Sequence, residues 1–300
     1  MENSGAASSL QTDYRIREKP YYLPIGDEVE VFERAWAEQI PLLLKGPTGC
    51  GKTRFVEYMA YQLGQKVYRL RQKGDAVGVE ATDFRTGPGV LYTVACHEDL
   101  TARDLTGRYI IKGGEAIWVD GPAAMAAKEG AILYLDEIVE ARKDVTVVIH
   151  PLTDHRRVLP IEVLGVQIEA PKSFMVVVSY NPGYQNIRKN LKPSTRQRFV
   201  SLSFSYPPPE KEREIVEVES GVRRDIAESL VVLAGDVRNI SNIDLEEGVS
   251  TRSLIHAGKL IRRGLTPRRA CSLAIAQAIT DEPDEIDAIQ VIVDRIFRES

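Results

Sequence analysis

The segment that most restricts the possible folds runs from Gly46 to Thr53 and reads GPTGCGKT, which satisfies the phosphate-binding pattern GxxxxGK[ST]. This pattern joins a strand to a helix, because the chain must turn tightly between the two. The apolar residues 42–44 directly precede the pattern and are bounded by proline and glycine, as expected for a buried parallel strand. The sequence therefore predicts an α/β fold with a phosphate cradle after this strand.

The candidate cradle consists of Gly46, Pro47, Thr48, Gly49, Cys50, Gly51, Lys52 and Thr53. Its glycines let successive backbone N–H groups point inward at the phosphates, and the following helix adds the partial positive charge of its N-terminus. We expect Lys52 to reach the β- and γ-phosphates of ATP and Thr53 to place its hydroxyl on Mg²⁺. A glycine-rich turn without a ligand is the alternative, and the motifs downstream argue against it.

An acidic pair follows the next apolar run. Residues 132–135 are Ile-Leu-Tyr-Leu, and Asp136 and Glu137 come directly after them. We expect Asp136 to hold the Mg²⁺ shell and Glu137 to orient and polarise the attacking water, since phosphoryl transfer depends mainly on positioning and charge stabilisation. The pair indicates hydrolysis, and a solvated strand end is the alternative.

Four more polar residues are candidates for the same chemistry. Asn181 follows the apolar residues 174–179 at the expected carboxyl edge of the sheet, where ligands of α/β proteins bind, although Asn-Pro is also a turn signal. Arg196 and Arg198 precede another apolar segment, and either fits an arginine finger. Arg252, at the start of a predicted helix, fits a phosphate sensor. For the three arginines, an ordinary surface position is the alternative.

Buried strands that alternate with helical patterns predict a parallel sheet sandwiched by helices. The composition changes at residues 207–209, which are all proline, and the later patterns are all helical, at residues 210–220, 225–238, 251–263, 267–280 and 284–297. Thr266 fits an N-cap. We therefore expect a flexible leader over residues 1–20, an α/β nucleotide-binding domain over residues 21–206 and a small helical lid domain over residues 207–300.

Composition narrows the possible partners and compartment. The formal charge of −4 gives no basic excess, which disfavours nucleic acid as the main partner. The three cysteines lack metal-ligand spacing and the density of a disulfide framework, so a reducing cytoplasm fits best. No long uninterrupted apolar run is present, and we expect no membrane insertion.

The motifs together resemble those of AAA+ ATPases of the MoxR group, and within that group the CbbQ/NirQ/NorQ family. The resemblance covers most of the chain. It is carried by residues 19–22 (KPYY), 44–60, 96–101, 120–122, 130–142 (GAILYLDEIVEAR), 150–157 (HPLTDHRR), 179–185 (SYNPGYQ) and 192–199.

The resemblance implies a hexameric ring with ATP bound between subunits. It matches Asn181 to a sensor asparagine, Arg198 to the arginine finger with Arg196 as a second candidate, and Arg252 to a second sensor. Two further segments, at residues 105–119 and 155–168, resemble the hairpin insertions of the group. Between residues 67 and 94 this chain departs from the pattern with an extra, loop-like segment, which we expect to join strands at residues 66–71 and 90–95.

The resemblance also implies a partner protein with a von Willebrand factor A domain. The CbbQ type resembles Rubisco activases that free inhibited active sites of sugar phosphates, and the NirQ/NorQ types support maturation of nitric oxide reductase. The KPYY opening favours the CbbQ type. The aromatic side chains Tyr14, Tyr21 and Tyr22 fit either partner recognition or packing over the adenine.

Two other function classes share the phosphate cradle. A P-loop kinase would pass the γ-phosphoryl group to a small acceptor, and Glu137 argues against it because this residue is placed to activate water. A nucleic-acid motor is disfavoured by the acidic balance. The sequence thus favours an ATP-hydrolysing motor that remodels a protein.

Overall fold

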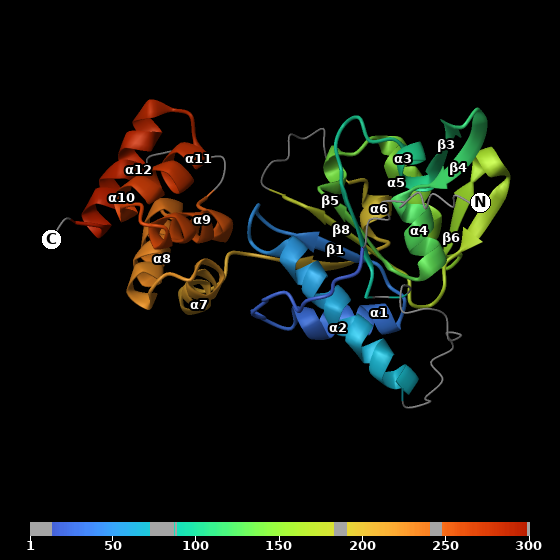
Figure 1. Cartoon of the computed structure of the whole chain (residues 1–300), viewed down its shortest axis with the longest axis horizontal. Helices are drawn as coiled ribbons and strands as arrows, with labels where there is room; N and C mark the ends of the chain where they lie inside the picture. Colours follow the sequence, from blue (N-terminus) through green and yellow to red (C-terminus); the bar gives the residue numbers. More distant parts are fainter. Residues whose placement is uncertain (1–13, 73–86, 88, 183–190, 241–247, 299–300) are drawn as a thin grey trace, which may run out of the picture.

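The computed structural model describes residues 14–72, 87, 89–182, 191–240 and 248–298. These residues form an α/β part, which lies to the right in Figure 1, and a helical part to the left, which a single chain segment joins to it. Within the described residues, no helix is long and apolar enough to cross a membrane.

A five-stranded parallel sheet forms the centre of the α/β part, as the sequence predicts. Its strands stand in the order β2-β5-β8-β1-β9. Their bounds are β1 Leu42–Lys45, β2 Leu91–Ala95, β5 Ile132–Asp136, β8 Met175–Tyr180 and β9 Val200–Ser203. Because all five strands run the same way, their carboxyl ends meet at one edge of the sheet.

Helices cover both faces of the sheet, because neighbouring residues of each strand point to opposite sides. Leu42 and Leu44 pack in one apolar cluster with α1 (Glu28–Ala37) and α2 (Lys52–Gln72). Leu43 packs in a second cluster on the other face, which includes residues of α4 (Pro122–Glu129) and α5 (Lys143–Ile149). The predicted sandwich is confirmed, and it holds the strand ends rigidly.

One predicted strand is wrong. Residues 66–71 belong to α2, which continues to Gln72. Phe55, Met59 and Leu63 stand four residues apart and are fully buried, and no proline interrupts the helix that starts at Lys52. The helix that starts at Lys52 therefore continues through residues 66–71. Residues 73–86 and 88, the rest of the extra segment, lie outside the described residues.

Both predicted hairpins are present. The first joins β3 (Gly107–Lys112) to β4 (Glu115–Asp120), and the second joins β6 (Val158–Ile161) to β7 (Val166–Glu169) through the 3-10 turn Glu162–Leu164. The remaining short elements of this part are α3 (Ala102–Thr106), α6 (Pro193–Arg196) and the 3-10 turns Ile138–Glu140 and His150–Leu152.

The helical part has an apolar core of its own, formed only by residues beyond 215. It contains α7 (Pro209–Ser220), α8 (Arg224–Arg238), α9 (Thr251–Arg262), α10 (Pro267–Cys271), α11 (Gln277–Ile279) and α12 (Pro283–Ile296). Thr266 accepts a hydrogen bond from the backbone N–H of Arg269, as an N-cap does. The expected helix over residues 267–280 contains a π-helical turn, Ser272–Ala276. The division of the chain at residue 206 stays a prediction.

The segment before α1 packs against the α/β part. The tyrosines 14 and 92 stack with ring centroids 4.4 Å apart, and Arg15 bridges to Val90 beside β2, so this end of the expected leader is paired. Tyr22 packs on Phe55 of α2 and donates a hydrogen bond to Glu28, 2.8 Å away. Residues 1–13 lie outside the described residues.

Candidate nucleotide-binding site

The residues of the candidate cradle form the turn from β1 into α2, at the carboxyl edge of the sheet. Gly49 and Gly51 adopt φ angles of 70° and 103°, which L side chains rarely adopt. A Cβ at Gly49 would lie 2.6 Å from the Cβ of Ser250, which precedes α9. The cradle thus needs glycine for its own turn and for its contact with the helical part.

Lys52 is the first residue of α2, and its side chain folds back over the cradle. Its ammonium group donates to the carbonyl oxygens of Gly46 and Pro47 at 2.7 and 2.9 Å. The side chain is buried, so the cation depends on these two oxygens for the hydrogen bonds that water would supply. A phosphate anion at the cradle offers a stronger, charge-assisted partner to the same group.

Thr53 and Asp136 meet across the sheet edge. The Thr53 hydroxyl lies 3.4 Å from Asp136 Oδ2. The other carboxylate oxygen, Oδ1, accepts a hydrogen bond from the Tyr134 hydroxyl at 2.7 Å and another from the Ser179 hydroxyl. Asp136 is therefore held by two neighbours, and its second oxygen faces the Thr53 hydroxyl. A carboxylate oxygen and a hydroxyl oxygen are ligands of the kind that Mg²⁺ prefers.

Glu137 follows Asp136 in the left-handed conformation, with φ 53° and ψ 51°. A non-glycine residue held there is strained by about 1–3 kcal/mol, and such strain collects at functional sites. Its backbone N–H donates to Ser179 Oγ at 3.2 Å, and its carboxylate accepts from the backbone N–H of Asn181 at 3.2 Å. Burial raises the pKa of the Glu137 carboxyl, the nearby Lys52 ammonium opposes this rise, and Asp136 adds to it.

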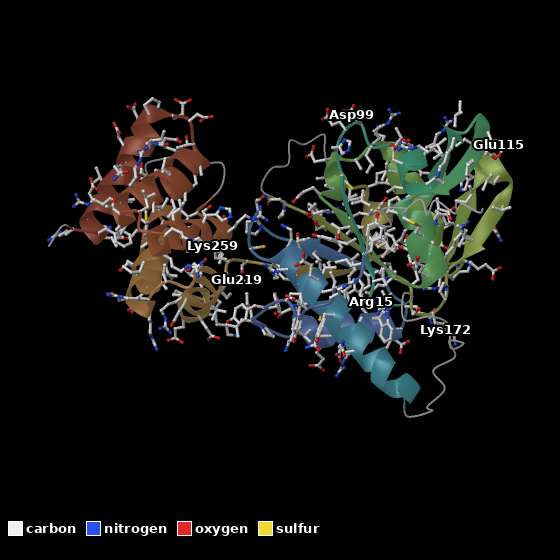
Figure 2. All side chains as sticks on the ribbon, viewed as in Figure 1. Arg15, Asp99, Glu115, Lys172, Glu219 and Lys259 are labelled. Carbon is white, nitrogen blue, oxygen red and sulfur yellow. The ribbon has the colours of Figure 1, made fainter. Side chains whose placement is uncertain are left out.

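A cavity of about 860 Å³ lies over the cradle, between the α/β part and the helical part. Gly49, Lys52, Asp136, Glu137 and Asn181 all line it. The helical part contributes residues that include Arg252, His256 and Lys259, which follow one another at helical spacing on α9. Figure 2 shows Lys259 and Glu219 on the side of the helical part that faces the α/β part.

The predicted site residues thus fall into two groups. Residues 48–53 of the cradle, Asp136, Glu137, Asn181 and Arg252 line the cavity, whereas Gly46 and Pro47 of the cradle do not. Arg196 and Arg198 do not line it. Arg198 instead donates to Asp154 at 3.0 Å, and its Nε atom is buried without a partner among the described residues.

The donors present fit a magnesium-bound nucleoside triphosphate. The cavity combines a glycine cradle, a buried lysine and two oxygen ligands 3.4 Å apart, so phosphate and cation each have their usual partners. Apolar side chains at Tyr22, Leu23 and Ile255 line the same cavity and suit the flat faces of a base.

Sequence reasoning missed two residues that hold Asp136. Tyr134 stands two residues before Asp136 on β5, so strand alternation puts both side chains on the same face, and that signal was available. Ser179 is a polar residue inside the apolar run of β8, which is a second signal. Both side chains are fully buried.

Comparison with known proteins places the chain in a family. The CbbQ/NirQ/NorQ C-terminal model matches residues 212–296, and the model of the AAA domain (dynein-related subfamily) matches residues 79–199. NorQ of Paracoccus denitrificans is 54% identical over 278 residues, which span 93% of this chain and 94% of that protein. The chain belongs to the CbbQ/NirQ/NorQ family.

Two further relatives are nearly as similar. CbbQ of Hydrogenophilus thermoluteolus is 49% identical over 96% of this chain and 99% of that protein. The denitrification regulatory protein NirQ of Pseudomonas aeruginosa is 50% identical over 92% of this chain and 96% of that protein. The three names occur at similar identity, so they establish the family without separating its branches.

The fold has a counterpart among solved structures. A mutant of RuvB from Thermotoga maritima superposes with a TM-score of 0.50 at 16% identity, covering 90% of this chain and 71% of that one. This likeness shows the P-loop NTPase fold. Together with the AAA family match, it makes the chain a nucleotide-binding ATPase of the AAA+ class.

Tyr134→Phe tests whether the hydroxyl on Asp136 orients the cation site. It removes one hydrogen bond to a carboxylate and leaves the ring in place. Because outer partners of metal ligands commonly change metal affinity by about 10- to 100-fold, we expect the Mg²⁺ concentration needed for half-maximal binding of a fluorescent ATP analogue to rise about 10-fold.

The matched control is Tyr92→Phe, since Tyr92 is also a buried tyrosine of the sheet but donates to Glu129 at 2.8 Å. Its Mg²⁺ midpoint should match that of the unmodified protein. Equal midpoints in both variants would show that the Tyr134 hydroxyl does not orient Asp136.

Proposed function

We propose that this protein hydrolyses ATP with Mg²⁺ and uses the turnover to remodel a partner protein. The observation that carries the proposal is the meeting of Thr53 with Asp136 beside Glu137, in a cavity that the cradle and the helical part share. Mg²⁺ bound there would neutralise phosphate charge. Thr53 and Asp136 are the residues that would hold it.

The remaining residues have distinct roles in this proposal. Lys52 would exchange the carbonyl oxygens of Gly46 and Pro47 for phosphate oxygens, and the backbone of the cradle would hold the phosphates in line. Glu137 would accept a hydrogen bond from the attacking water, and its raised pKa makes its carboxylate a stronger base. Asn181 would fix the position of Glu137 or of the water.

The proposal includes a ring in which each nucleotide is shared by neighbouring subunits. Arg196 and Arg198 follow β8 and lie outside their own chain's cavity, so an arginine from this region would reach a nucleotide only on another subunit. Arg196 is exposed and Arg198 is half-buried beside Asp154. Six subunits are what the family resemblance implies.

Glu137→Gln should bind ATP and hydrolyse it at least about 100-fold more slowly, because the amide keeps the shape of the side chain but cannot act as a base. Binding is measured with a fluorescent analogue and turnover by phosphate release. Glu140→Gln is the control, since Glu140 also lines the cavity, three residues further on. Normal turnover in Glu137→Gln would remove this residue from the mechanism.

A mixing experiment tests whether the arginine acts between subunits. Arg198→Ala keeps an intact cradle, and Lys52→Ala keeps an intact arginine. Each alone should be nearly inactive, whereas a mixture should regain part of the ATPase activity, because some interfaces combine an intact cradle with an intact arginine.

The same mixture made with Arg196→Ala identifies which arginine serves as the finger. If Arg198 is the finger, Arg196→Ala should keep its ATPase activity when assayed alone, and the reverse should hold if Arg196 is the finger. A variant that carries both Arg196→Ala and Arg198→Ala and still hydrolyses ATP as a dilute monomer would contradict a nucleotide site shared between subunits.

The partner and client in this proposal come from the family. A protein with a von Willebrand factor A domain would link the ring to its client. Inhibited Rubisco is the client that the KPYY opening favoured, but Tyr21 contacts Glu214 and Tyr22 contacts Glu28 within this chain. These contacts tie the opening to the rest of the chain, and its preference for the CbbQ type rests on resemblance alone.

Maturation of nitric oxide reductase is the second candidate client. NorQ and CbbQ are 54% and 49% identical to this chain, and a further relative bears the name of a denitrification regulatory protein, so the names leave both clients open. A cytoplasmic location completes the proposal, since Cys50, Cys96 and Cys271 form no disulfide among the described residues.

The client test uses the protein purified together with its von Willebrand factor A domain partner. With ATP, the pair should restore carboxylation by Rubisco inhibited with a bound sugar phosphate, and Glu137→Gln should abolish the effect. Failure on Rubisco, with loss of nitric oxide reductase activity in cells that carry Glu137→Gln, would identify the second client. No effect on either enzyme would contradict both client assignments.

A further inference from the structure

A buried carboxylate lies where three helices of the helical part meet. Glu212 of α7 is 1% exposed. Arg238 of α8 donates to both of its oxygens at 2.8 and 2.7 Å, and the hydroxyl of Thr251, the first residue of α9, donates at 2.6 Å. A buried charge is tolerated only when it is paired and hydrogen-bonded, so these contacts fix the three helices against one another.

Arg238 extends these contacts toward the α/β part. Its Nε atom donates to the carbonyl oxygen of Val249 at 2.8 Å, just before α9. Its guanidinium carbon lies 4.0 Å from the centre of the Tyr206 ring. A stacked and bidentate arginine is held in one orientation, and lysine cannot replace such a group.

Tyr206 connects the same group to the phosphate cradle. Its hydroxyl lies 3.2 Å from the carbonyl oxygen of Gly248 and 3.4 Å from that of Thr48, which belongs to the cradle. Tyr206 stands directly before the proline segment that leads into α7. We call Tyr206, Glu212, Arg238 and Thr251 the lid node.

Arg252 directly follows Thr251, the last member of the lid node in the sequence, and it lines the cavity. It is exposed, and no hydrogen bond or ion pair to the described residues holds its guanidinium. The backbone at the start of α9 therefore places Arg252 beside the cavity, and the lid node holds that backbone through Thr251 and Val249.

We infer that the lid node positions two groups for nucleotide binding. It holds the helical part against the cradle at Thr48, and it keeps the start of α9 where Arg252 reaches the phosphates. This inference rests on the proposed function and on the expected role of Arg252 as a phosphate sensor. Tyr206 is the member that touches both parts, so loss of its hydroxyl loosens the helical part relative to the cradle and leaves the buried ion pair intact.

An ordinary stabilising role makes a different prediction. A group that only adds stability lowers the melting temperature of the nucleotide-free protein and leaves the KM for ATP unchanged. A positioning group raises KM when its contact is lost, because the cradle and Arg252 then bind the phosphates less well. The two roles are separable by measuring KM, kcat and melting temperature for each variant.

The main test is Tyr206→Phe, which keeps the ring beneath Arg238. We expect the KM for ATP to rise about 3- to 10-fold, the size expected for one lost hydrogen bond, with kcat changed by less than about 2-fold. Thr251→Val removes a different contact of the lid node and should shift KM in the same direction. An unchanged KM in both variants would overturn the inference.

Arg295→Ala is the matched control. Arg295 pairs with Asp236 on α8 at 2.6 Å, but both side chains are exposed and neither lines the cavity. The KM of this variant should equal that of the unmodified protein. A rise in KM as large as that of Tyr206→Phe would show a general effect of loosened helices and would overturn the inference.

A double-mutant cycle with Arg252→Ala separates this inference from the proposed function. Arg252→Ala alone should raise KM, and an unchanged KM there would contradict the proposed role of Arg252. If the lid node acts through Arg252, then Tyr206→Phe should add little to Arg252→Ala. Effects on KM that multiply in the double variant would overturn the inference while leaving the role of Arg252 intact.

Discussion

The structure depends on the packing of one strand, β8, between the strands that lead to the cradle and to the acidic pair. β8 pairs with β1 on one side and with β5 on the other, all parallel. This arrangement brings Thr53 and Asp136 to 3.4 Å, although they are far apart in the sequence. Ser179 of β8 donates to Asp136 and accepts from the backbone of Glu137, so the middle strand also fixes both acids.

The two sides of the site are built on separate apolar cores. Strand residues that point to alternate faces are buried by helices on both sides, and the cradle and acids are held at their ends. The helical part has a separate core and meets the cavity through α9 and the lid node. A nucleotide in this cavity would therefore contact both parts.

Much of this arrangement is predictable from the sequence, because apolar strands that end in polar residues carry their own signal. The cradle, Asp136, Glu137 and Asn181 come together as expected from the rule that parallel strands end at one edge. The contact of Tyr134 with Asp136 was also predictable, because side chains two residues apart on strand β5 point to the same face. The strand predicted at residues 66–71 shows where prediction from the sequence fails. A short segment of apolar and polar residues does not by itself distinguish strand from helix, and here it continues the helix that precedes it.

The lid node was beyond prediction from one sequence. Glu212 and Arg238 are charged residues on helices, where the usual expectation is an exposed face, and only the three-dimensional packing reveals their burial. The positions of Arg196 and Arg198 away from the cavity also depend on tertiary structure. The division of the chain at residue 206 and the catalytic roles of the individual residues stay predictions.

The proposed function depends on the cradle at residues 46–53 binding the phosphates of a nucleotide through Lys52. Calorimetric titration of ATP with Mg²⁺ into Glu137→Gln, with and without Lys52→Ala, tests it most directly, because hydrolysis is suppressed in both proteins. We expect clear heat of binding in the first protein and at least about 10-fold weaker binding in the second, because the second lacks a charge-assisted contact. Equal affinity in both proteins would contradict it.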